Sequence, residues 1–200
     1  VDDLIPLTRA VVRGSTRALV IADLPFGSYE SSPEQAVATS TRFFKEAGAM
    51  AVKLEGAHLA TVEKLTSIGI PVMGHLGLTP QSLHQLGGYR VQGRTDGDAI
   101  YEAALALEKA GAFAIVLELV PAELAARITK ALTIPTIGIG AGGNCDAQVL
   151  VWTDMAGFTA NPPKLAKAYR NMRADLLAAT QEFAEEVRSG AFPADAQTFH

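Results

Sequence analysis

The chain has 200 residues, of which 48% are hydrophobic and 19% are charged, a balance typical of a globular domain with a sizeable core rather than a disordered chain. Its formal net charge of -4 gives no support to a nucleic-acid partner or an anionic membrane. No apolar run approaches the ~20 residues of a membrane span. The single cysteine, Cys145, excludes an intrachain disulfide, so we expect a cytoplasmic protein.

Short apolar runs alternate with helix-like stretches along the whole chain. Pro33 after Ser32 is typical of a helix start, and Gly48 of a helix end. The patterns predict, in order, helix 2–13, strand 18–23, a helix starting at Pro33, strand 50–54, helix 58–68, strand 71–74, a brief helix 80–86, helix 96–110, strand 113–118, helix 121–131, strand 134–139, strand 148–152 and one or two helices within 163–189.

This alternation of strands and helices predicts a parallel sheet, and the pattern leaves two architectures open. An open doubly wound sheet would be complete with six strands, whereas a (β/α)8 barrel would need two more. The chain begins without methionine and within a helix-like stretch, which favours a barrel with its first two βα units missing. We therefore expect residues 1–200 to form one N-terminally incomplete barrel domain that ends in helices at 163–200.

Three of the apolar runs lead into a carboxylate: ALVIAD ends at Asp23, MAVKLEG contains Glu55, and FAIVLEL contains Glu118. Because the carboxyl ends of parallel strands open on one face, these side chains should converge there. Carboxylates held together need a cation or a proton to offset their repulsion. The pattern predicts an enzyme site, with a divalent metal as the natural counter-ion.

Long motifs occur in a fixed order along the chain: ADLPFGSY (22–29), AVKLEG (51–56), PVMGHLGLTPQSLHQLGGYRVQGR (71–94), EKAGAFAIVLELVPAELA (108–125), IPTIGIGAGGNCDAQVLVWTDMAGF (134–158) and FPADAQTF (192–199). Together they resemble the ketopantoate hydroxymethyltransferase family over nearly the whole chain. The resemblance implies a (β/α)8 TIM barrel of the phosphoenolpyruvate/pyruvate type. It also implies Mg2+-dependent transfer of a hydroxymethyl group from methylenetetrahydrofolate to 3-methyl-2-oxobutanoate, giving ketopantoate for pantothenate and coenzyme A. Members of the family are commonly homo-oligomers, often decamers.

The same resemblance implies roles for five residues of this chain. Asp23 would bind the metal and contact the substrate, and Glu55 would be a second carboxylate at the metal. Lys53 would hold the substrate carboxylate, His75 would contact the substrate, and Glu118 would be the catalytic acid/base. Mg2+ needs only one or two carboxylates beside waters and substrate oxygens, and proton transfer suits a partly buried glutamate.

Each of these residues also has a structural interpretation. Asp23 could be a turn or cap residue, and Lys53 could pair with Glu55, since residues two apart in a strand point the same way. His75 could support the fold, and Glu118 could belong to a buried ion pair. We treat His58 and His84 as surface or packing residues.

The sequence departs from the family pattern in two respects, and one glycine-rich stretch could be mistaken for a different site. The family's GDS-type metal motif is absent and is expected upstream of Val1; a polypeptide starting there should be inactive and poorly stable. Ala57 and Ala147 stand where the family more often has glycine, which is costly if positive φ is required. The GIGAGG stretch (138–143) lacks the helix and acidic partner of a dinucleotide site. Cys145 has no histidine near it in sequence, so it is not expected to be a nucleophile.

Two alternative functions remain open from the sequence. One is another Mg2+-dependent 2-oxo acid aldolase or lyase, and the other is an inert truncated barrel.

Overall fold

A computed structural model describes residues 1–199, and the chain divides into two compact units, Val1–Val149 and a second that begins at Leu150. Each unit is described by itself. The first contains the sheet, whose six parallel strands are β1 (Ile21–Asp23), β2 (Ala51–Lys53), β3 (Val72–Gly77), β4 (Ala114–Glu118), β5 (Thr136–Ile139) and β6 (Ala147–Gln148).

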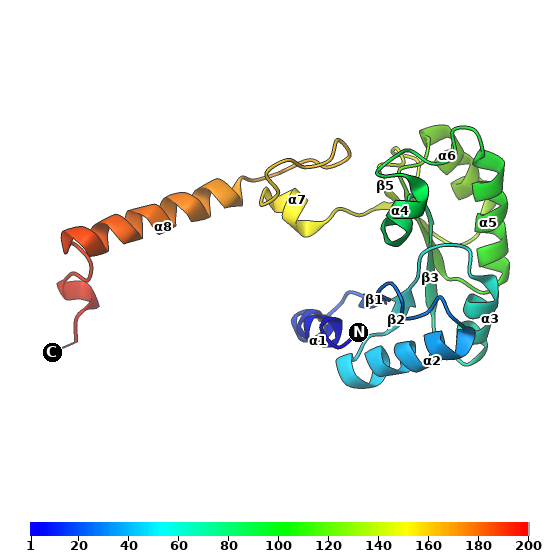
Figure 1. The fold of residues 1–200 in the computed structure, drawn as a ribbon, viewed down its shortest axis with the longest axis horizontal. Helices are drawn as coiled ribbons and strands as arrows, with labels where there is room; N and C mark the ends of the chain where they lie inside the picture. Colours follow the sequence, from blue (N-terminus) through cyan, green and yellow to red (C-terminus); the bar gives the residue numbers. More distant parts are fainter. Residues whose placement is uncertain (200) are drawn as a thin grey trace. The chain divides into compact units, whose positions relative to one another are not determined.

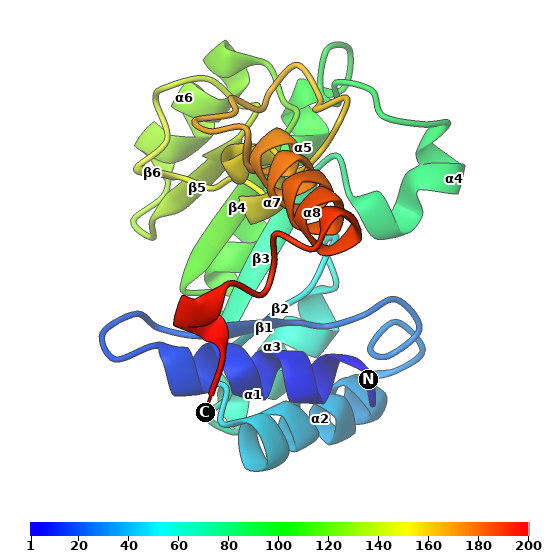
Figure 2. The same cartoon turned by 90° about the vertical axis from the view of Figure 1, so that its left-hand side faces the viewer.

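The strands pair in chain order, from β1 beside β2 through to β5 beside β6, and the sheet curls as it goes (Figure 2). Every pairing is parallel, and His75 lies opposite Val116 while Gly77 lies opposite Glu118. A doubly wound sheet reverses its strand order at a switch point, and no such reversal occurs here. The order is that of a barrel wall, so the open doubly wound alternative is wrong.

Helices cover the outer side of this sheet (Figure 1). Helix α2 starts as expected, because Pro33 occupies its first turn and the Ser32 side chain accepts a hydrogen bond from the backbone N–H of Gln35. The helical segments of the first unit are α1 (Leu4–Gly14), α2 (Pro33–Arg42), the π-helix η1 (Phe43–Ala47), α3 (Leu59–Ser67), the 3-10 helix η2 (Pro80–Ser82), α4 (Leu83–Leu86), α5 (Gly97–Lys109) and α6 (Ala122–Ala131).

The core lies between the strands and these helices. Val52, Leu54, Ile115 and Leu117 are completely buried, as expected for parallel strands that are covered on both faces. In β2 and its extension, Val52 and Leu54 alternate with Lys53 and Glu55, so the apolar pair faces the helices and the charged pair faces the inside of the curl.

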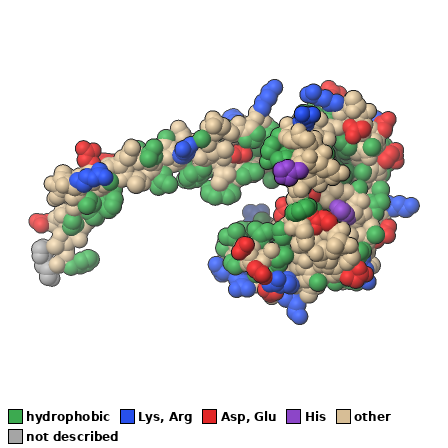
Figure 3. All heavy atoms as spheres, in the orientation of Figure 1, with side chains coloured by type: hydrophobic (Ala, Val, Ile, Leu, Met, Phe, Trp, Pro, Cys, Tyr) green, Lys and Arg blue, Asp and Glu red, His purple; other side chains and the backbone are tan. Residues whose placement is uncertain are grey.

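The second unit contains α7 (Trp152–Ala156), α8 (Met172–Ser189) and the 3-10 helix η3 (Asp195–Gln197). No residue of α8 is buried within the described chain, and its surface mixes hydrophobic and charged side chains along its length (Figure 3). No helix within residues 1–199 is long and apolar enough to cross a membrane.

Most expected elements are present, but several differ in extent; β1, for example, begins at Ile21 rather than at residue 18. Strand β3 runs to Gly77 rather than ending at residue 74, because it pairs with β4 at five consecutive positions. Of the strand expected at 148–152 only Gln148 belongs to a strand, since β6 ends there and the carbonyl of Val151 accepts from Asp154 and Met155 and starts α7. Residues 163–171 are not helical; Asn171 caps α8, accepting a hydrogen bond from Ala174.

Candidate active site

Five charged or titratable side chains meet at the carboxyl edge of the sheet. Lys53 Nζ lies 2.9 Å from Asp23 Oδ1 and 3.2 Å from His75 Nδ1. His75 Nδ1 is 3.8 Å from Glu55 Oε1, and His75 Nε2 is 3.3 Å from Glu118 Oε2. Strands β1 to β4 thus supply one continuous line of contacts, which brings together all five residues singled out from the sequence.

The line runs from an exposed end to a buried centre. The Asp23 side chain is 55% exposed, whereas Glu55 is 6% exposed and His75 is equally enclosed. Burial raises the pKa of the Glu55 carboxyl, and the Gln81 N–H, His75 and Lys53 offset part of that rise. A carboxylate that is costly to ionise therefore lies beside groups that favour its charged form.

The contacts of His75 define which ring nitrogen carries the proton. The ammonium of Lys53, paired with Asp23, can only donate, so His75 Nδ1 accepts from it. The remaining proton of a neutral ring is then on Nε2, which faces Glu118 Oε2. Nε2 has no partner with hydrogen-bond geometry among residues 1–199. This buried N–H can therefore donate a hydrogen bond to the Glu118 carboxylate after a small movement of that side chain, or to an atom of a bound ligand.

Unusual backbone supports the Glu118 end of the line. Leu119 has a positive φ of 46°, a conformation that costs a non-glycine residue of order 1–3 kcal/mol. It is held by its N–H, which donates to Ile139 O, and by its carbonyl, which accepts from Gln92. Gly77 has φ +93°, and a Cβ there would collide with the Glu118 carbonyl oxygen. Both features fix where β4 ends.

Two residues of the site were missed by sequence reasoning. Tyr29 is 1% exposed, and its hydroxyl accepts a hydrogen bond from the Glu55 N–H at 3.1 Å and donates to Gln81 Oε1 at 2.6 Å. The Gln81 backbone N–H donates to Glu55 Oε2 at 2.9 Å. Both lie in the motifs that carry the family resemblance, but neither is charged, and a search for metal ligands and proton carriers passes over them.

Asp23 and Glu55 are the candidate ligands for a cation at this edge. Within residues 1–199 no group of three or more His, Cys, Asp or Glu side chains is arranged to hold a metal. Asp23 and Glu55 nevertheless offer hard carboxylate oxygens on the same edge, one of them largely exposed. Mg2+ takes one or two carboxylates and keeps waters or substrate oxygens as its other ligands, so these residues fit that ion better than a softer one.

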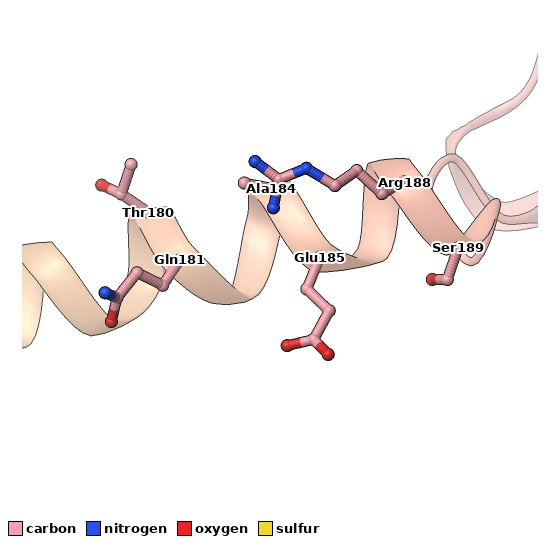
Figure 4. A pocket seen from close by; sticks show the side chains of 6 residues that line it. All are labelled: Thr180, Gln181, Ala184, Glu185, Arg188 and Ser189. Atoms are coloured by element: carbon pink, nitrogen blue, oxygen red, sulfur yellow. The ribbon is translucent and has the colours of Figure 1, made fainter.

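Other features weighed from the sequence do not form the site. Among the described residues neither Ala57 nor Ala147 has a positive φ, so neither alanine is strained. After Gly143 the chain passes into β6 rather than a helix, which excludes a dinucleotide loop. A shallow depression along α8 (Figure 4) is lined by one exposed helix alone and gathers no converging groups. Its lining residues are Thr180, Gln181, Ala184, Glu185, Arg188 and Ser189.

Comparison with known proteins identifies the family. A family model of ketopantoate hydroxymethyltransferase matches residues 1–195. The chain belongs to this family. It is 61% identical over 197 residues to a 3-methyl-2-oxobutanoate hydroxymethyltransferase of Frankia alni, with 96% of this chain and 65% of that protein covered. The corresponding protein of Saccharopolyspora erythraea is 60% identical, with 100% and 69% covered. The chain thus spans about two thirds of the length of these hydroxymethyltransferases.

Solved structures with a similar fold support the α/β part of the fold prediction. The chain is similar to phosphonopyruvate hydrolase in complex with oxalate and Mg2+, with TM-score 0.52, 18% identity, and 98% of this chain and 70% of that chain covered. It is equally similar to 2,3-dimethylmalate lyase, a member of the PEP mutase/isocitrate lyase superfamily, with TM-score 0.52, 16% identity and 99% and 70% covered. At such identities the likeness shows an α/β fold with a curled parallel sheet, which is the coarser part of what the motifs implied.

Proposed function

We propose that this protein transfers a hydroxymethyl group from methylenetetrahydrofolate to 3-methyl-2-oxobutanoate, giving ketopantoate for pantothenate and coenzyme A synthesis. Membership of the family supports the reaction. The observation that carries it to this chain is the line of contacts from Asp23 through Lys53 and His75 to Glu118. It provides a cation, carboxylates and a proton carrier on one edge, which is what carbon–carbon bond formation beside a ketone requires.

In this proposal Asp23 and Glu55 hold Mg2+, which when bound polarises the ketone of the oxo acid and acidifies the neighbouring C–H. Lys53, already between Asp23 and His75, supplies the positive charge for the substrate carboxylate. Asp23 lies at the exposed end of the line, where an entering oxo acid would meet it first. When the oxo acid binds, the Lys53 ammonium gives up part of its ion pair with Asp23 and pairs with the substrate carboxylate.

Glu118 is the general base in this reaction. Its carboxylate takes the proton from C3 of the oxo acid, and the electron pair left there forms the new bond to the one-carbon unit. In the overall reaction the bonds from that carbon to the folate nitrogens break, water supplies the hydroxyl oxygen of the product, and tetrahydrofolate leaves with its nitrogens protonated. The His75 Nε2–H, 3.3 Å from Glu118 Oε2, can donate to that carboxylate and aim it. The buried surroundings of His75 keep water away from this part of the edge.

We further propose that the full architecture is a (β/α)8 barrel of the phosphoenolpyruvate/pyruvate type, because a curled sheet with barrel strand order closes with two further strands. In that reading residues 1–200 belong to one barrel domain, with residues 163–200 as its C-terminal helical part. The family resemblance supports a cytoplasmic homo-oligomer, a decamer in the usual case, acting on small molecules and not on nucleic acid or membranes.

The test is turnover of the protein, together with any residues that precede Val1, with 3-methyl-2-oxobutanoate and methylenetetrahydrofolate, following ketopantoate and tetrahydrofolate with and without Mg2+. We expect both products in equal amounts, and loss of turnover when the metal is chelated. Cleavage of a 2-oxo acid without folate would replace this function by that of a lyase. Absence of any Mg2+-dependent heat when the oxo acid is titrated into the protein would point to an inert barrel.

A further inference from the structure

Gln81 connects three parts of the site edge although it carries no charge. It lies in η2, just after β3. Its backbone N–H donates to Glu55 Oε2 at 2.9 Å, and its side-chain Nε2 donates to the Leu24 carbonyl, next to Asp23, at 2.8 Å. Its Oε1 accepts from the Tyr29 hydroxyl at 2.6 Å. Gln81, which itself follows β3, thus contacts the segments that follow β1 and β2 and connects all three.

The Tyr29 hydroxyl closes these contacts into a ring. It accepts from the Glu55 N–H at 3.1 Å and has one proton to give. The Gln81 Oε1 at 2.6 Å is a better acceptor for that proton than the Glu55 carbonyl at 3.4 Å. The ring therefore runs from Gln81 N–H to the Glu55 carboxylate, and from the Glu55 N–H through Tyr29 back to Gln81.

The ring fixes the orientation of the Gln81 amide. A flipped amide would place its oxygen against the Leu24 carbonyl, and two acceptors would face each other. The Tyr29 ring is buried and packs edge-on against His58 with centroids 5.5 Å apart. A buried, fully specified polar ring of this kind holds its members rigidly, including the carboxylate of Glu55.

We propose that Gln81, acting with Tyr29, is a positioning residue that sets the carboxylate of Glu55 and the Leu24–Asp23 segment in register with each other. Its effect on rate rests on the proposed function, because Glu55 and Asp23 are the groups that function uses. The ring itself exists independently of any reaction. Gln81 does not belong to the line of proton carriers, so its influence is exerted through the residues it holds.

The test uses Gln81→Met, which keeps the length of the side chain but removes both side-chain hydrogen bonds while the backbone N–H can still donate to Glu55, and Tyr29→Phe, which removes the hydroxyl. Both are also combined. Gln85→Met and Tyr89→Phe are matched controls, because both residues are exposed in the segment that follows. The measurements are kcat and KM for the oxo acid, thermal unfolding, and amide hydrogen exchange of the peptide that contains Glu55, taken without substrate.

We expect each ring variant to lower kcat about tenfold or more, since small misplacements of reacting groups are costly, and to speed exchange at the Glu55 amide. The double variant should be no worse than the more affected single one, because both changes break the same Tyr29–Gln81 hydrogen bond that closes the ring. Wild-type kcat and wild-type exchange in a folded Gln81→Met protein would overturn the inference, as would multiplicative effects in the double variant. If the unchanged protein shows no hydroxymethyl transfer, the proposed function fails, and the exchange measurement alone decides the role of Gln81.

Discussion

His75 Nε2 and Glu118 Oε2 lie 3.3 Å apart, and the opposite ring nitrogen of His75 accepts from Lys53. Because a neutral imidazole has one proton, the accepting nitrogen facing Lys53 puts the donating nitrogen toward Glu118. The imidazole therefore links the cation of β2 to the carboxylate of β4.

Replacing Glu118 tests the proposed base. Glu118→Gln keeps the shape of the side chain, and its amide oxygen can still accept a hydrogen bond from His75, but the amide cannot take a proton from the substrate. We expect kcat to fall by about 10²-fold or more while the folded structure survives. Turnover of the oxo acid by stopped assay measures this, and Glu123→Gln, an exposed change in α6, serves as the control. A kcat within a factor of two of the unchanged protein would exclude Glu118 as the base.

Removing the charge of Lys53 tests substrate binding. Lys53→Met deprives Asp23 of its partner and His75 Nδ1 of its donor. We expect KM for the oxo acid to rise about tenfold or more, because a charge-assisted hydrogen bond to a carboxylate is lost. Steady-state kinetics gives this value, with Lys64→Met on the exposed face of α3 as the control. An unchanged KM would leave Lys53 with a structural role alone.

Two glycines with positive φ allow a matched test of backbone support. Gly77 (φ +93°) faces the Glu118 carbonyl, whereas a Cβ on Gly87 (φ +73°) would meet nothing within 4 Å. Gly87→Ala should cost about 1 kcal/mol of stability from its dihedral angles alone. Gly77→Ala adds a collision and should cost clearly more, with a loss of kcat as Glu118 moves. Urea unfolding compares the two, and equal costs would contradict the predicted role of Gly77.

The buried carboxyl of Glu55 predicts a pH effect on stability in magnesium-free buffer. Its pKa in the native state is raised by burial above the ordinary value of 4.5, so the native state binds this proton more tightly than the unfolded chain. The stabilisation that comes from this tighter proton binding is fully present below the pKa that the carboxyl has in the unfolded chain. It is lost as pH rises through the higher pKa that the carboxyl has in the native state. Glu55→Gln cannot lose a proton, so its stability relative to the unchanged protein should increase toward neutral pH.

Urea unfolding at several pH values measures this difference, and turnover of the same variant should be strongly reduced. Glu63→Gln, exposed in α3, supplies the comparison in which stability keeps the ordinary pH profile. A difference between Glu55→Gln and the unchanged protein that stays constant with pH would mean that the carboxyl titrates as in the unfolded chain.

The sequence predicted the helices, the strands and the charged site residues better than the neutral residues that hydrogen-bond to them. Asp23, Glu55 and Glu118 could be found because each follows a buried apolar run, and strand order then brings them to one edge. Tyr29 and Gln81 could not, because their contacts cross from one loop to another and no local pattern encodes them. Of the strand expected at 148–152 only Gln148 is in a strand, and α7 begins at Trp152. Most apolar side chains of this run are exposed in the structure, so their hydrophobicity alone did not distinguish a buried strand from a loop and a helix start.

The strict succession of strands β1 to β6 also governs how the site can be assembled. Asp23, Lys53, His75 and Glu118 come from strands that each lie beside the one made just before, so every contact in the line joins neighbouring stretches of chain. Each such contact closes one βα unit of chain, a non-local pairing that forms more slowly than a helical contact, and each unit can pair as soon as it is complete. During synthesis on the ribosome, the working edge can therefore be laid down one βα step at a time.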